Sequence, residues 1–136
     1  MEQAISSGRL GSYTLQAAIA AVHSQAPTAA QTNWSQIVAL YDLLLRAEPS
    51  PIVELNRAAA VGFGVGPQAG LELLAPLLAN PTLERYQPLH AAHADLLRRA
   101  GDSAGAARAY ERAISLSANA VERAELQRRL STLDVD

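Results

Sequence analysis

The chain has 136 residues, of which 49% are hydrophobic and 18% charged, and this length and composition predict one ordered domain with a buried core. It has no Cys, which excludes a disulfide framework, a Cys-ligated zinc site and a cysteine nucleophile. Its formal net charge is −2 and all eleven basic residues are Arg, which argues against general nucleic-acid binding and excludes a phosphate-binding or Schiff-base Lys.

No targeting or membrane segment is expected. The first residues, Met1–Ala4, carry neither the basic stretch nor the apolar run of a secretory signal. The apolar stretch Leu71–Leu78 is interrupted by Glu72 and Pro76, and it is much shorter than the roughly 20 residues that span a bilayer. We therefore expect a cytoplasmic protein.

Capping residues and apolar spacing predict a succession of helices. Asn33, followed three residues later by Gln36, has the pattern of a capping box, and Ser50-Pro51 has the pattern of an N-cap and first helical residue. Gly101 is a suitable residue for the end of a helix. The predicted helices cover Ser12–Gln25, Trp34–Ala47, Pro51–Phe63, Pro67–Ala79, Gln87–Ala100, Asp102–Ser117 and Asn119–Leu133.

Two features are expected to interrupt these helices. Pro76 should kink or shorten the helix that contains it, because proline lacks the backbone donor. The glycine-rich segment Gly62–Gly66 follows a helix and not a strand, so it is interpreted as a flexible turn and not as a phosphate-binding loop.

The helices also repeat. Ala94 and Leu97 precede Gly101-Asp102, and a small–aromatic–small series follows it: Ala106, Tyr110 and Ala113. This pattern resembles the tetratricopeptide repeat, in which small residues let two antiparallel helices approach closely. A second copy contains Gly70, Leu74 and Leu77, and a third contains Ile37, Tyr41 and Leu44. The resemblance implies an all-α, right-handed stack of tetratricopeptide-like hairpins over residues 12–136, with a C-terminal capping helix and a connector over residues 1–11.

A closer resemblance rests on four blocks of sequence: Gly11–His23, Trp34–Asp42, Pro49–Ala58 and Ala94–Arg99. Together they resemble the C-terminal extension of extracytoplasmic-function sigma factors that carry a tetratricopeptide tail. The resemblance implies a regulatory domain that modulates transcription initiation through contacts with its own sigma core, with RNA polymerase or with a regulatory protein. The DNA-binding sigma domains are not in this chain, so we expect it not to bind promoter DNA.

In such a stack the first helix of each hairpin lines a concave groove. Asn56 is of particular interest because its amide both donates and accepts hydrogen bonds, as binding to a peptide backbone requires; it is equally compatible with bridging a neighbouring hairpin. The candidate groove residues are Gln16, His23, Asn56, Arg57, Asp95, Arg98 and Arg99.

No catalytic, cofactor or metal site is expected. His90 and His93 are three residues apart and share a helix face, but no third ligand accompanies them, so a packing or groove role is favoured. Two other functions remain open: a free-standing scaffold that binds an unrelated peptide, and a small-molecule sensor or enzyme that uses a cavity between helices.

Overall fold

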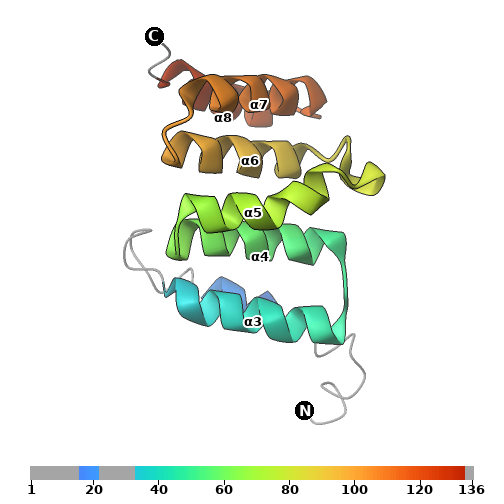
Figure 1. Ribbon diagram of the computed structural model, residues 1–136. Helices are drawn as coiled ribbons and strands as arrows, with labels where there is room; N and C mark the ends of the chain where they lie inside the picture. The colour runs from blue at the N-terminus through green and yellow to red at the C-terminus, as the bar shows by residue number, and fades with distance from the viewer. Residues whose placement is uncertain (1–15, 22–32, 134–136) are drawn as a thin grey trace.

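The computed structural model describes residues 16–21 and 33–133, which are helical and contain no strand (Figure 1). The prediction of an all-α fold is therefore confirmed for this part of the chain. Residues 16–21 are helical and fall inside the first predicted helix, whereas the rest of that helix and the connector over residues 1–11 lie outside the described residues. The other helices are α3 (Trp34–Ala47), α4 (Pro51–Gly64), α5 (Pro67–Leu78), the 3₁₀ helix η2 (Pro81–Leu83), α6 (Gln87–Arg99), α7 (Ser103–Leu116) and α8 (Ala120–Ser131).

Helices α3 to α8 form a stack in which each helix packs on the next one along the chain (Figure 1). The helices lie across the long axis of the stack, and a further contact joins α4 to α6. Because connections as short as Ala100–Asp102 reverse the chain between neighbours, α6 and α7 run antiparallel. Every helix therefore shares its apolar faces with its sequence neighbours.

Local capping sets where the helices begin, as the sequence predicts. One side-chain oxygen in each of four residues accepts a hydrogen bond from a backbone N–H two or three residues later: Asn33, Ser50, Asp102 and Asn119. These bonds occupy donors that the first turn of a helix leaves unpaired. Gly101 has a φ of +89°, a left-handed conformation that favours glycine at the end of α6.

The interpretation of Gly62–Gly66 as a flexible turn is wrong for its first three residues, which belong to α4. Gly62 is buried where α4 crosses α5, and a Cβ added to Gly70 would lie 2.6 Å from the Gly62 Cα. Gly70 therefore has no side chain because the backbone of α4 leaves no room for one at this crossing. The turn itself is confined to Val65 and Gly66. Pro76 lies inside α5, which ends at Leu78, one residue before the predicted end.

Three apolar clusters form the core, each joining neighbouring layers. The first includes Ile19, Ile37 and Leu44 and joins residues 16–21 to α3 and α4. The second joins α4, α5, η2 and α6 around Leu55, Leu74, Leu89 and Leu96. The third joins α6, α7 and α8 around Ala94, Ala106, Tyr110, Ala113 and Leu126.

The predicted packing of Ala106, Tyr110 and Ala113 is confirmed, since all three are fully buried in the third cluster. Trp34, which the sequence places on an apolar stripe, packs partly buried against the first cluster. Within the described ranges, every helix is too short or too polar to cross a bilayer.

Candidate binding groove

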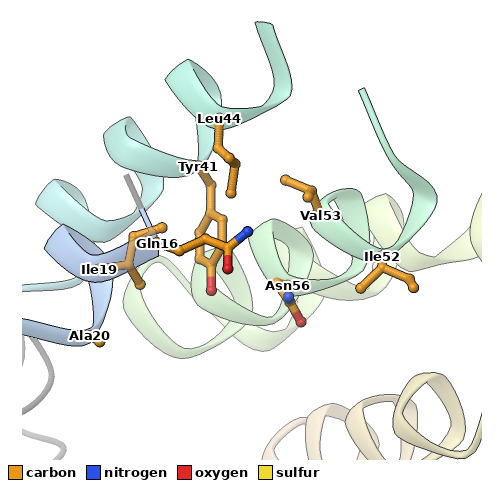
Figure 2. Close-up of a pocket in the computed structure, with 8 residues that line it drawn as sticks. All are labelled: Gln16, Ile19, Ala20, Tyr41, Leu44, Ile52, Val53 and Asn56. Atoms are coloured by element: carbon orange, nitrogen blue, oxygen red, sulfur yellow. The ribbon is translucent and has the colours of Figure 1, made fainter. Parts of the chain in front are cut away.

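Three hollows follow one another along the stack, each sharing wall residues with the next, and together they are called the inter-helix groove. The first has a volume of about 390 Å³ and lies between residues 16–21, α3 and α4 (Figure 2). The second, of about 160 Å³, shares Tyr41 and Asn56 with the first. The third, of about 340 Å³, shares Phe63 with the second and lies between α6 and α8. The groove therefore crosses most of the described layers.

The first hollow combines an apolar wall with uncharged polar groups (Figure 2). Ile19, Leu44 and Val53 are buried and supply the apolar wall. Gln16 and Asn56 are exposed and bring an amide from two different helices. Burial raises the pKa of the Tyr41 hydroxyl, so this group remains a protonated donor at neutral pH. Amides and a phenol around an apolar wall suit a polypeptide backbone with apolar side chains.

Phe63 occupies the middle of the groove and joins three helices. Its ring lies 5.6 Å from that of Trp34 on α3, with an angle of 42° between the planes. The Arg99 guanidinium of α6 lies over the same ring, 4.3 Å from its centre. A cation on an aromatic face is an attractive contact, so Arg99 covers Phe63 while its own side chain stays exposed.

Asp95 lines the third hollow and connects α6 to α7 and α8. Its Oδ1 accepts a hydrogen bond of 2.5 Å from the Tyr110 hydroxyl, and its Oδ2 accepts one of 2.8 Å from Arg129. Arg98 lies 3.9 Å away on the same helix. Burial, together with the bond to Asp95, raises the pKa of Tyr110 to about 12. The carboxylate is thus held in place by groups from two other helices.

The predicted groove residues are only partly brought together. Gln16 and Asn56 both line the first hollow, and Asp95 lines the third. Arg57 lies on α4 but its Nε donates to Asp42 Oδ1 at 2.6 Å, so it ties α4 to α3. His23 lies outside the described residues.

Several residues of the groove were not anticipated as binding residues, notably Tyr41, Phe63, Glu125 and Arg129. Phe63 lies seven residues after Asn56, a spacing that places both on one helix face, and it is the only Phe in the chain. That signal was available in the sequence. The contact between Arg129 and Asp95 was not predictable from the sequence, because 34 residues separate them.

The polar residues of the groove do not form a metal-binding or nucleophilic arrangement. Across residues 16–21 and 33–133, no three His, Cys, Asp or Glu side chains gather closely enough to hold a metal ion. His90 and His93 lie away from the groove, in a separate hollow between α6 and α7.

Comparison with known proteins gives a relative without an assigned role. The chain is 41% identical over 133 residues to an uncharacterized protein of Rhizobium meliloti (strain 1021). The alignment covers 98% of this chain but 31% of the relative, so the chain spans about a third of the relative's length. No protein-family model matches the chain, and no solved structure matches it.

Proposed function

We propose that this chain is a protein-interaction domain of an alternative RNA polymerase sigma factor, and that it modulates transcription initiation by holding a polypeptide in the inter-helix groove. The observation that carries the proposal is the succession of three hollows, in which the first two share Tyr41 and Asn56 and the last two share Phe63. A groove that crosses several layers offers an extended surface, which suits a peptide segment better than a small substrate.

The proposal includes a finer architecture, a right-handed stack of tetratricopeptide-like hairpins. In it α4 pairs with α5, α6 pairs with α7, and α8 is the capping helix. Gly70 and Ala106 occupy equivalent positions of the repeat, and both are buried small residues. This agreement supports the alignment of the two hairpins, since small residues are needed where paired helices approach.

The sigma-factor role rests on the four sequence blocks and is supported by the position of Asn56, which lies within the block Pro49–Ala58 and lines two hollows. The proposed partner is the sigma core of the same protein or a regulatory protein that contacts it, in the cytoplasm. A tethered partner has an effective concentration in about the millimolar range, so even weak contacts with the groove would be occupied.

The test measures transcription from the cognate promoter by the full-length protein, with the upstream reading frame included. Asn56→Ala should change transcription because it removes an exposed amide from the groove without emptying the core. Arg57 is left intact because its bond to Asp42 makes a substitution there structural. Gln68→Ala is the matched control, since Gln68 is an exposed amide on α5 that lines none of the three hollows.

The outcomes distinguish three parts of the proposal: the groove as the binding surface, the regulatory role, and the sigma-factor assignment. If Asn56→Ala folds normally and transcribes as the parent does, the groove is not the regulatory surface. If deletion of residues 12–136 also leaves transcription unchanged, the regulatory role itself is wrong. A reading frame that lacks sigma domains upstream would favour the free-standing scaffold instead.

A further inference from the structure

A fourth hollow, separate from the inter-helix groove, lies between α6 and α7 and has a volume of about 540 Å³. On α6 it is lined by His90, His93 and Leu97, whereas the groove is lined by Ala91 and Asp95. At 3.6 residues per turn these two sets fall on opposite faces of the helix. The hollow is therefore independent of the proposed function, and we call it the outer hollow.

Basic side chains predominate around the outer hollow. Arg108 and Arg112 are one turn apart on α7 and face His90 and His93 on α6. The acid in its lining is Asp102, whose Oδ1 already accepts the Gly105 N–H at 2.9 Å as the cap of α7. Over the described ranges, neither guanidinium forms an ion pair with a carboxylate. The two guanidinium groups thus outnumber the one carboxylate of the lining, and neither is paired with it.

One backbone oxygen, that of Glu84, holds two of these groups. His90 Nε2 donates to the Glu84 carbonyl oxygen at 2.9 Å, and an Arg112 nitrogen donates to the same oxygen at 3.4 Å. Two basic side chains from different helices therefore converge on one point. Since a guanidinium has five N–H donors, Arg112 keeps donors for a ligand, and Arg108 donates to no group in residues 16–21 and 33–133.

The rest of the lining has no polar side chain and comes from Leu78, Leu97, Gly105 and Ala109. Small-molecule sites commonly have a volume of about 300–1,000 Å³ and combine an apolar wall with a few charged groups that fix orientation. Arginine is well suited to such a role because its planar guanidinium matches a carboxylate or phosphate group. We propose that the outer hollow binds a small organic anion, with its carboxylate or phosphate group held by Arg108 and Arg112 and its apolar part against Leu78 and Leu97.

The test follows the ring resonances of His90 and His93 by NMR while hexanoate, inorganic phosphate or hexanamide is added to the 136-residue chain. Saturable shifts with hexanoate, with phosphate or with both are expected. The anion that produces them shows whether the hollow prefers a carboxylate or a phosphate group. Hexanamide has the same tail without the charge and should not produce them. Equal shifts with hexanamide, or no saturation with either anion, would overturn the proposal.

Variants locate the binding. Arg108→Gln with Arg112→Gln should weaken anion binding about ten-fold or more, the loss of roughly one charged hydrogen bond. The control, Arg46→Gln with Arg123→Gln, makes the same charge change at two exposed residues outside the hollow and should bind as the parent does. If the first double variant unfolds, Arg108→Gln alone replaces it, because Arg108 is exposed. Unchanged affinity in a folded Arg108 variant contradicts the proposal.

Discussion

The Tyr110 hydroxyl donates a hydrogen bond of 2.5 Å to Asp95 Oδ1, and this bond joins the core between α6 and α7 to the wall of the inter-helix groove. The Tyr110 ring is fully buried among small residues of α6 and α7, whereas Asp95 lines the third hollow. The residue that fills the gap between two helices therefore also positions a polar group of the groove.

Replacing Tyr110 with Phe keeps the ring and removes this bond. Because Asp95 then loses a buried donor, we expect the free energy of unfolding to fall by roughly 1–3 kcal/mol. Urea unfolding at neutral pH measures the change. A parent-like midpoint would mean that the hydroxyl contributes no net stability.

The same bond predicts a pH dependence above neutrality. The pKa of Tyr110 is raised to about 12 in the folded protein, so its contribution to stability is complete below the ordinary value of 10.0 and is lost as the pH rises toward 12. The difference in urea midpoint between the parent and Tyr110→Phe should therefore narrow above pH 10. A constant difference up to pH 12 would contradict this linkage.

The crossing of α4 and α5 predicts opposite outcomes for two glycines. A Cβ at Gly70 would lie 2.6 Å from the Gly62 Cα and 2.9 Å from the Ala58 carbonyl oxygen, and backbone atoms cannot move aside easily. We expect Gly70→Ala to destabilise the protein by roughly 1–3 kcal/mol, in spite of alanine's better helix propensity.

Gly66→Ala is the control without a steric conflict, because no heavy atom of the described residues, its chain neighbours apart, lies within 4 Å of the added Cβ. Its thermal midpoint should equal or slightly exceed that of the parent, since alanine restricts the unfolded chain more than glycine does. If Gly70→Ala melts at or above the parent temperature, α4 and α5 do not approach as closely as described.

The crossing of α6 and α7 gives a third prediction. Ala113 is fully buried beside Tyr110, so Ala113→Leu should overpack the third cluster and cost roughly 1–3 kcal/mol. Ala104→Leu on the same helix is exposed and should leave the melting temperature within a few degrees of the parent. Equal melting of both variants would contradict the alignment of this hairpin with the repeat.

Helix positions were predictable because their signals are local. Asn33 and Asp102 cap helices through backbone groups three residues away, so the sequence alone places these starts. Groove positions follow from helical spacing once one member is known, as Asn56 and Phe63 illustrate. Contacts between layers were not predictable in this way. Arg57 directly follows Asn56 and was expected to line the groove, whereas the packing of α4 on α3 brings it to Asp42.

The outer hollow provides the last prediction, a loss of stability on mild acidification. His93 is half-buried, and this burial lowers its pKa below the ordinary value of 6.5; nearby His90 lowers it further and Asp102 opposes the shift. Arg108 and Arg112 are the other charged residues in the lining of the hollow, and both stay charged throughout this range. Because the unfolded chain takes up this proton at higher pH than the folded protein does, stability should fall as the pH drops below about 6.5.

Thermal unfolding at pH 7.0 and 5.5 measures this fall in stability, and His93→Gln should make the fall smaller. The Glu125 carboxyl, whose pKa is held at about 2 by Arg128 and Arg129, does not titrate in this range. An equal fall in the parent and in His93→Gln would show that His93 is not the group responsible.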